Sequence, residues 1–199
     1  MRIKPNYEIE NSFQGEVVGI DEAGRGPLAG PVFAASVILE KKNIPLNIDD
    51  SKSLNAKKRE ALYQKITQTS YFGISMASEN EIDRLNILNA TLLAMRRSYI
   101  ILSWKLSRLP KNAIVDGNVS PRLPCKVSSI VKGDTKSLSI AAASILAKVS
   151  RDRHLSLLHL KYPHYDWNKN FGYPTKRHRL GLTIFGPSPH HRLTFKPIK

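Results

Sequence analysis

Val17-Val18-Gly19-Ile20-Asp21-Glu22-Ala23-Gly24-Arg25-Gly26-Pro27 is the stretch that decides the fold. Its β-branched residues predict a buried strand with two carboxylates at its end, and ionised carboxylates are expensive to bury without a cationic partner. Because neighbouring side chains of a strand point to opposite faces, Asp21 and Glu22 can share a ligand only where the backbone is already leaving the sheet. The glycines that follow provide this turn and let backbone N–H groups approach a ligand. The stretch therefore predicts a metal site next to a phosphate or sugar site.

The rest of the 199-residue chain shows further strand and helix patterns. We expect strands over 31–39, as an antiparallel partner of the first, and over 71–77, 113–117 and 126–131. We expect helices over 56–67, capped by Asn55, over 79–109 with a break near Asn86, over 137–161, and over 175–185. Strands that first form a meander and then alternate with helices predict an α/β domain, with a mixed five-stranded sheet and a helical C-terminal appendage.

The charge of the chain points to a polyanionic partner. Lys and Arg number 31 against 16 Asp and Glu, which gives a formal net charge of +15. Such an excess indicates nucleic acid, and we find no basic amphipathic helix with apolar anchors that would favour a membrane surface. Residues 135–199 hold twelve of the basic residues, only two acids and all six histidines. This region is either a phosphate-contacting surface or a solvated basic tail.

Cysteine usage and the N-terminal sequence indicate a compartment for the protein. Cys125 is the only cysteine, so neither a disulfide framework nor a thiolate metal cluster is expected. The first residues lack the apolar stretch of a signal peptide, and no run approaches the roughly 18 apolar residues of a spanning helix. We therefore expect a reducing, cytoplasmic location and no membrane association.

Acids stand at three predicted strand ends: Asp21 with Glu22, Asp116, and Asp134. Ligands in α/β sheets collect beyond the carboxyl ends of strands, so these groups can converge. Oxygen ligands favour Mg²⁺ or Mn²⁺ over zinc, and four acids around two such ions suit in-line displacement at phosphorus. The alternative is that they are surface acids at loop starts, where Asp is common. Asp152 is either an outer metal ligand or the partner of Lys148 one helical turn away.

Several separated segments together resemble the ribonuclease HII family. The segments are 19–32, with its Gly24-Arg25-Gly26 element, Asp50-Ser51-Lys52-Ser53-Leu54, Val115-Asp116-Gly117-Asn118, 132–149, Gly172-Tyr173-Pro174-Thr175-Lys176, and 186–192. They are collinear and reach from about residue 17 to the end of the chain. The resemblance implies an RNase H-like fold, with an irregular N-terminal lead over 1–16, a catalytic core over 17–161 and a helical substrate-contacting region over 162–199.

The resemblance also implies an activity. It is endonucleolytic cleavage on the 5′ side of a ribonucleotide, in an RNA–DNA hybrid or embedded in duplex DNA, leaving 3′-hydroxyl and 5′-phosphate ends. Such an enzyme serves ribonucleotide removal and RNA primer processing. The family's four metal-binding acids correspond to Asp21, Glu22, Asp116 and Asp134, the set already selected from the residues. We expect two Mg²⁺ or Mn²⁺ ions per site, a nucleic-acid substrate and a monomeric protein.

The resemblance further implies substrate contacts. Gly24, Arg25 and Gly26 correspond to a loop that contacts the ribose 2′-hydroxyl, the group that distinguishes RNA from DNA. Tyr173 corresponds to a tyrosine that stacks on the following deoxyribose. Ser51, Lys52, Ser144 and Lys148 correspond to backbone-phosphate contacts, although loop polarity and helix solvation would also explain them. Arg192 is a phosphate-contacting candidate on its charge alone.

Three alternatives differ from this interpretation. The similar type HIII enzymes carry an extra N-terminal domain and a Gly-Lys-Gly loop, whereas about 16 residues precede the first strand here and the loop has Arg25. Ser53 departs from the second lysine of many relatives, which predicts a weaker phosphate contact there. A non-catalytic RNA-binding protein explains the positive charge but not the acids. An integrase-like DNA nuclease would not need a loop that senses a 2′-hydroxyl.

Overall fold

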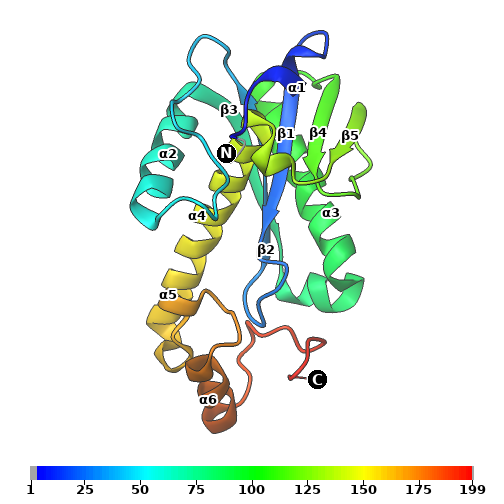
Figure 1. Ribbon diagram of the computed structural model, residues 1–199. Helices are drawn as coiled ribbons and strands as arrows, with labels where there is room; N and C mark the ends of the chain where they lie inside the picture. Colours follow the sequence, from blue (N-terminus) through cyan, green and yellow to red (C-terminus); the bar gives the residue numbers. More distant parts are fainter. Residues whose placement is uncertain (1–3, 199) are drawn as a thin grey trace.

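The computed structural model describes residues 4–198, and a five-stranded mixed sheet forms its centre (Figure 1). The strand order is β3-β2-β1-β4-β5. β1 pairs antiparallel with β2, and β2 with β3, whereas β1 pairs parallel with β4, and β4 with β5. The strands are β1 (Val17–Ala23), β2 (Val32–Leu39), β3 (Ser70–Ala77), β4 (Asn112–Asp116) and β5 (Lys126–Ile130). The predicted sheet and the antiparallel pairing of its first two strands are confirmed.

Helices cover both faces of the sheet. α3 (Glu79–Leu106) packs on one face, and α2 (Ala56–Thr69) and α4 (Leu138–Lys161) lie on the other (Figure 1). The shorter helices are α1 (Glu8–Asn11), α5 (Trp167–Asn170) and α6 (Lys176–Phe185), with 3₁₀ turns η1 (Gly133–Thr135) and η2 (Pro163–Tyr165). No helix of residues 4–198 has the length and apolar character needed to cross a membrane.

Strand β2 is buried on both of its faces, which explains its nearly continuous apolar sequence. Val32, Ala34 and Ile38 belong to the core under α3. The alternate residues Ala35 and Val37 belong to the core under α2 and α4. The two-residue period of the strand therefore separates two hydrophobic cores, one on each side of the sheet.

Helix boundaries follow the predicted caps. The Asn55 side chain accepts a hydrogen bond from the backbone N–H of Lys58 at the start of α2. In α3, Asn86 has a non-helical backbone with φ of 64°, so the predicted break lies at that residue. α3 ends at Leu106, three residues earlier than expected, where Ser107 adopts a left-handed conformation. Local capping chemistry thus sets most of these boundaries.

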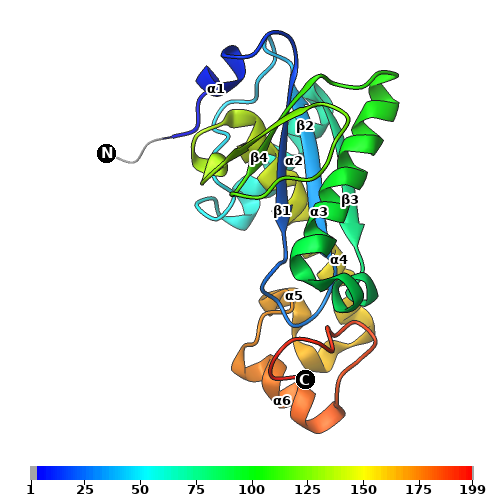
Figure 2. The ribbon, with the colours of Figure 1, turned by 90° about the vertical axis from the view of Figure 1, so that its right-hand side faces the viewer.

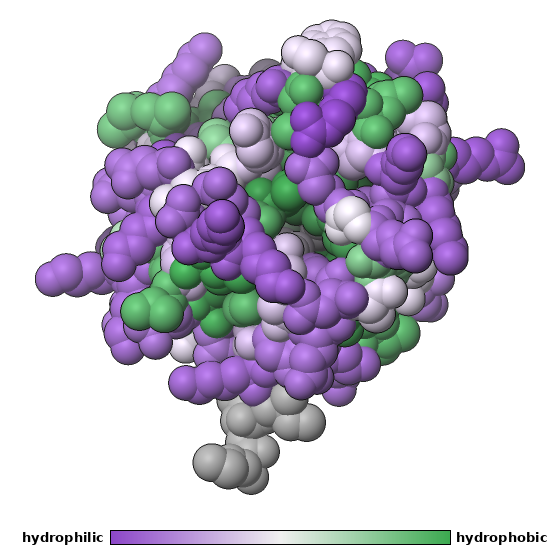
Figure 3. Space-filling model, turned by 90° about the horizontal axis from the view of Figure 1, so that it is seen from above, coloured by the Kyte–Doolittle hydropathy of each residue, from purple (hydrophilic) through white to green (hydrophobic). Residues whose placement is uncertain are grey.

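The C-terminal region returns to the loop between β1 and β2 (Figure 2). Leu155 of α4 packs with Ala29, Tyr165 and Trp167 in a small separate core. The backbone N–H of Gly30 donates to the His190 carbonyl, and that of Arg192 donates to the Leu28 carbonyl. Residues 24–31 are therefore fixed by chain that lies more than 100 positions away in the sequence. Seen from above, hydrophilic side chains cover most of the opposite end of the molecule (Figure 3).

Candidate metal centre and substrate pocket

Asp21 and Asp116 lie side by side because their strands are parallel and in register. The last paired residues of β1 and β4 are Ile20 and Val115, and the two aspartates follow them directly. Neighbouring parallel strands in register direct equivalent side chains to the same face. That face is the one covered by α4, since Ile114, two residues before Asp116, packs against Ile140. Two carboxylates are thereby placed together by the sheet itself.

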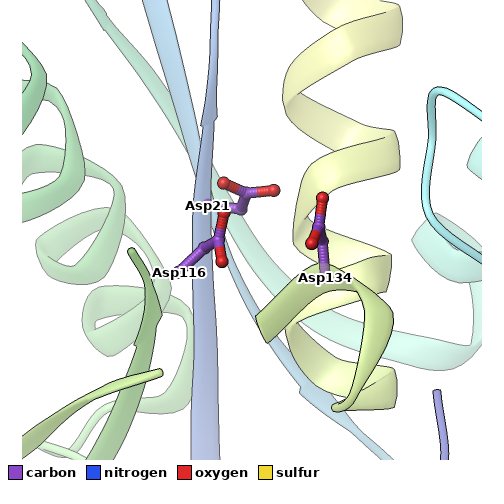
Figure 4. A group of neighbouring side chains, drawn as sticks. All are labelled: Asp21, Asp116 and Asp134. Carbon is purple, nitrogen blue, oxygen red and sulfur yellow. The ribbon is translucent and has the colours of Figure 1, made fainter. Parts of the chain in front are cut away.

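Asp134 completes a group of three carboxylates. One oxygen of each of Asp21, Asp116 and Asp134 lies within 4.8 Å of the others. The three carboxylates point toward one another in the space between β1 and α4 (Figure 4). The 3₁₀ turn η1 holds Asp134 in place, because the backbone N–H of Gly133 donates to Asp116 Oδ1 at 2.6 Å. A set of three oxygen ligands fits Mg²⁺ or Mn²⁺ and does not resemble a zinc site.

Glu22 lies beside this group rather than in it. We expected the backbone to leave the sheet at the two acids. It stays in the sheet, because the pairing of β1 with β2 continues through Asp21, Glu22 and Ala23. That expectation was wrong, and strand alternation turns Glu22 away from the face that carries Asp21. Glu22 nevertheless lines the same pocket, and its carboxylate lies 3.5 Å from Arg25 Nη1.

The carboxylates are crowded and poorly solvated. Burial, then the negative charges of Glu22 and Asp116, raise the pKa of Asp21 well above its usual range. Burial, then the charge of Asp116, also raises the pKa of Asp134. The pKa of Glu22 is raised mainly by burial, with the nearby Arg25 acting in the opposite direction. Arg25 and Lys52 each approach one carboxylate of the site, and a divalent ion would supply the further positive charge that carboxylates held so close together require.

Hydroxyl and ammonium groups from two other elements border the carboxylates. The hydroxyls of Ser51 and Ser144 are 2.8 Å apart and buried, and the nearby Ser144 hydroxyl acts to lower the pKa of Asp21 against the larger effect of burial. Lys52 Nζ lies 3.6 Å from Asp134 Oδ2, and its side chain is 82% exposed. Lys148 Nζ is instead paired with Asp152 at 2.7 Å. The helical-pair interpretation of Asp152 fits this geometry.

The Gly24-Arg25-Gly26 loop and Tyr173 face each other across a pocket of about 300 Å³ that also contains Asp21, Glu22 and Asp116. A Cβ atom on Gly26 would lie 3.6 Å from the Tyr173 ring, in ordinary contact. The Tyr173 side chain is 47% exposed. The pocket therefore joins a carboxylate cluster, a glycine-rich backbone and an open aromatic face in one place.

Arg192 is placed differently from our expectation of a phosphate contact. It is completely buried, and its guanidinium donates to the carbonyl oxygens of Gly24, Arg25 and Gly30. Its charge alone suggested a surface group, but a buried arginine with its donors engaged by backbone does not reach a phosphate.

Arg151 is a site residue that the sequence reasoning missed. It lines the pocket, is 1% exposed, and donates to the carbonyl oxygens of Ala29, Pro31 and Phe171. We did not single it out within the basic stretch 148–153 of this long helix. The one available signal was that Arg151 follows an almost wholly apolar helical segment, whose inward face it extends.

The sequence matches one family over nearly its whole length. The family model described as ribonuclease HII matches residues 18–198. Ribonuclease HII from Magnetococcus marinus is 53% identical over 202 residues, which cover 98% of this chain and 94% of that protein. Ribonuclease HII from Wolbachia pipientis wMel is 48% identical over 195 residues, covering 98% and 96%.

Solved structures show the same fold. Ribonuclease HII from Archaeoglobus fulgidus, solved in a complex with PCNA, superimposes with a TM-score of 0.73 at 27% identity, over 92% of this chain and 96% of that one. Ribonuclease H2 from Pyrococcus horikoshii OT3 gives a TM-score of 0.73 at 27% identity, over 92% and 95%. Bst-RNase HIII, solved with Mn²⁺, gives 0.77 over 92% and 68%, but at 18% identity this likeness shows the fold alone. The expected RNase H-like fold is confirmed.

Proposed function

The chain belongs to the ribonuclease HII family, and on that premise we propose that its clustered acids hold two divalent ions that serve hydrolysis on the 5′ side of a ribonucleotide. The activity is that of the family, an endoribonuclease acting on RNA–DNA hybrids. We propose that it extends to single ribonucleotides embedded in duplex DNA and leaves 3′-hydroxyl and 5′-phosphate ends. The observation that carries the proposal is the convergence of Asp21, Asp116 and Asp134 within 4.8 Å in a protein of net charge +15.

The donor set fits Mg²⁺ or Mn²⁺, because it consists of carboxylate oxygens whose mutual repulsion Lys52 and Arg25 offset only in part. Asp21 and Asp116 would be the central ligands, and Glu22 and Asp134 would complete the two ion sites. Bound ions would supply activation of the attacking water and stabilisation of the leaving oxygen. The protein's own task is to keep the carboxylates ionised and fixed, which the Ser144 hydroxyl would assist by favouring the ionised form of Asp21.

Recognition of the ribonucleotide is assigned to the loop and the aromatic ring that face each other. The amides of the Gly24–Gly26 loop would contact the 2′-hydroxyl and the adjoining phosphate. Tyr173 would stack on the next sugar, since its ring is open to solvent. Lys52 is the best placed phosphate contact, because its ammonium group is exposed at the edge of the pocket. Ser51, Ser144 and Lys148 would contact phosphates of the same nucleic-acid strand. In the structure the two serine hydroxyls hydrogen bond to each other, and Lys148 pairs with Asp152.

We further propose the division of labour expected from the sequence. Residues 17–161 would provide catalysis, residues 162–199 would contact the substrate, and residues 1–16 would be an N-terminal lead. The protein would act as a monomer in the cytoplasm, in ribonucleotide removal and RNA primer processing.

One assay tests the function against its rivals. A DNA duplex with one central ribonucleotide is incubated with the protein in Mg²⁺, in Mn²⁺ or in EDTA, beside an all-DNA duplex of the same sequence. We expect a single nick on the 5′ side of the ribonucleotide in either metal, none in EDTA and none in all-DNA. Binding without nicking would favour a non-catalytic RNA-binding protein. Nicking of the all-DNA duplex would favour an integrase-like nuclease.

A further inference from the structure

Two buried arginines lie directly behind the substrate-facing loop. Arg151 comes from α4 and is 1% exposed, and Arg192 comes from the C-terminal segment and is 0% exposed. Neither forms an ion pair with a carboxylate among residues 4–198. A buried charge is ordinarily paired, so two unpaired guanidinium groups at one place require an explanation.

The hydrogen bonds of Arg192 all go to backbone carbonyls of the loop between β1 and β2. Two of the three made by Arg151 go to the same loop, and the third goes to the Phe171 carbonyl. Arg192 Nη2 donates to the Gly24 carbonyl at 2.5 Å, and Nη1 donates to the Arg25 carbonyl at 2.9 Å. Its Nε donates to the Gly30 carbonyl at 2.9 Å, so the guanidinium spans both ends of the loop. Arg151 holds the end of the same loop through the carbonyls of Ala29 and Pro31. The planar fork of arginine suits this task, whereas lysine is a point donor.

This arrangement dictates where the loop amides point. In a trans peptide the C=O of one residue and the N–H of the next are antiparallel. The carbonyls of Gly24 and Arg25 point inward to Arg192, so the N–H groups of Arg25 and Gly26 point outward. Neither of these two amides makes a hydrogen bond within residues 4–198. Both residues line the pocket that contains the carboxylates and Tyr173.

The two guanidinium groups also carry charge at neutral pH. Burial lowers the pKa of Arg151 to about 10 and that of Arg192 to about 9, so both stay protonated. Their positive charge lies behind the outward-pointing amides and adds to the attraction for an anion or a hydroxyl oxygen on the pocket side.

We propose that Arg192, supported by Arg151, is a positioning residue for ribonucleotide recognition, holding two carbonyls inward so that the amides of Arg25 and Gly26 face the ribose 2′-hydroxyl as preformed donors. Arg192 acts through the loop and touches no substrate itself. The inference rests on the proposed function, since it presumes that this loop reads the ribonucleotide.

The test measures discrimination and not activity alone. Two dissociation constants are measured for each protein, one for an all-DNA duplex and one for the duplex with one ribonucleotide, and the first is divided by the second. The variants R192K and R192M are each combined with D21N, in which no cleavage is expected. We expect this ratio to exceed one in D21N and to fall to one in both double variants, with the all-DNA Kd unchanged. In the cleaving background, R192K is expected to lower kcat/KM by on the order of a hundredfold, as displaced binding groups do.

R153M is the control, because Arg153 of α4 is also an arginine but is exposed, where it pairs with Glu60. It removes one positive charge and should leave the ratio unchanged. A folded R192K protein that keeps the full ratio would overturn the proposal, as would an equal weakening of both Kd values. R192K keeps volume and charge, so it decides the matter if R192M does not fold. Failure of the unsubstituted chain to nick the ribonucleotide duplex would instead refute the proposed function.

Discussion

Asp21 of β1 and Asp116 of β4 stand one position beyond the last register pair of their two parallel strands, on the sheet face covered by α4. Nothing but the parallel pairing is needed to bring these two carboxylates together. The closeness is unfavourable in isolation, since burial and the charge of Asp116 both contribute to the raised pKa of Asp21. A buried carboxylate pair of this kind is typical of a divalent-metal site, which is the role we propose for it.

Replacing Asp21 with Asn should abolish cleavage while leaving binding of the duplex largely intact. It should also stabilise the metal-free protein at pH 7. Folding raises the pKa of this carboxyl. At low pH it is protonated in both the folded and the unfolded protein and does not affect stability. As the pH rises toward and through the folded pKa, the carboxyl destabilises the folded state. The gain in the free energy of unfolding should therefore appear at pH 7 and vanish near pH 3. Thermal unfolding at the two pH values measures it.

Metal addition provides the complement to that measurement. Millimolar Mg²⁺ or Mn²⁺ should raise the melting temperature of the unsubstituted protein at pH 7, because a ligand that binds only the folded state stabilises it. The rise should be lost in D21N and kept in E60Q, a control at an exposed carboxylate that pairs with Arg153. An equal rise in D21N would remove Asp21 from the set of metal ligands.

Sequence patterns were sufficient for the sheet and the longer helices, and the three aspartates expected to converge do so. The short helices α1 and α5 were not predicted. Apolar runs and caps are local signals, so the break at Asn86 and the cap at Asn55 could be predicted. The continuation of β1 through Glu22 could not, because its ladder depends on how far β2 extends beside it. The glycines after the acids suggested an early turn, and the tertiary pairing overrode that local preference.

The buried arginines mark the other limit of prediction. Arg151 and Arg192 are basic residues in a basic region, and composition gives no sign that they are inside. Their burial depends on contacts with the loop after β1, which is distant in the sequence. The Arg192–Gly30 hydrogen bond joins residues 162 positions apart, and the Arg151–Ala29 hydrogen bond joins residues 122 positions apart. Charged side chains are almost always exposed, and that expectation fails here because every guanidinium nitrogen of the two arginines donates to a backbone carbonyl.

Substitution of Gly24 by Ala should disrupt the loop. Gly24 has φ of +99°, and a Cβ atom there would lie 1.9 Å from Arg151 Nε. Strain at a positive φ costs about 1–2 kcal/mol by itself, and displacement of a buried arginine adds to it. Gly15 offers a matched control, since it also has a positive φ, of +85°, but has open space around it. We expect G24A to unfold at a clearly lower urea concentration than G15A and to lose activity, whereas G15A should keep its activity. Similar losses of stability in both would show that the contact with Arg151 is unimportant.

Changes at Tyr173 should separate stacking from hydrogen bonding. The ring is half exposed and faces Gly26 across the pocket. Tyr173→Phe keeps the ring, so cleavage of the ribonucleotide duplex should stay close to that of the unsubstituted protein. Tyr173→Ala removes a stacking surface worth about 1–3 kcal/mol, which corresponds to a loss in kcat/KM of roughly 5- to 150-fold. Steady-state kinetics on the same duplex measures kcat/KM for both variants. If Tyr173→Phe lowers kcat/KM as much as Tyr173→Ala does, the hydroxyl and not the ring is responsible.

A buried histidine pair should make the fold sensitive to acid. His178 Nδ1 lies 2.9 Å from the Tyr173 carbonyl, which can only accept, so this nitrogen carries the proton and Nε2 is the acceptor. His191 Nε2 donates to it at 3.0 Å, while His191 Nδ1 accepts from the backbone N–H of Ser188 at 2.9 Å. Protonation of His191 would place a second donor on Nδ1, directly against the Ser188 N–H, and this hydrogen bond would be lost. Burial, then the neighbouring His178, lowers the pKa of His191 to about 4.

The sign of this effect follows from linkage. The folded pKa of His191 lies below its ordinary value of 6.5, so its contribution to stability is complete above pH 6.5 and is lost as the pH falls toward 4. The loss is about 3 kcal/mol, from about 1.4 kcal/mol for each pKa unit. His191→Asn removes the titrating group, so the difference in the free energy of unfolding between the two proteins should shrink over this window. His159→Gln, at a histidine outside the pair, should keep the full pH dependence. If the unsubstituted protein and H191N lose stability in parallel between pH 6.5 and 4, protonation of His191 does not limit the acid stability of the C-terminal region.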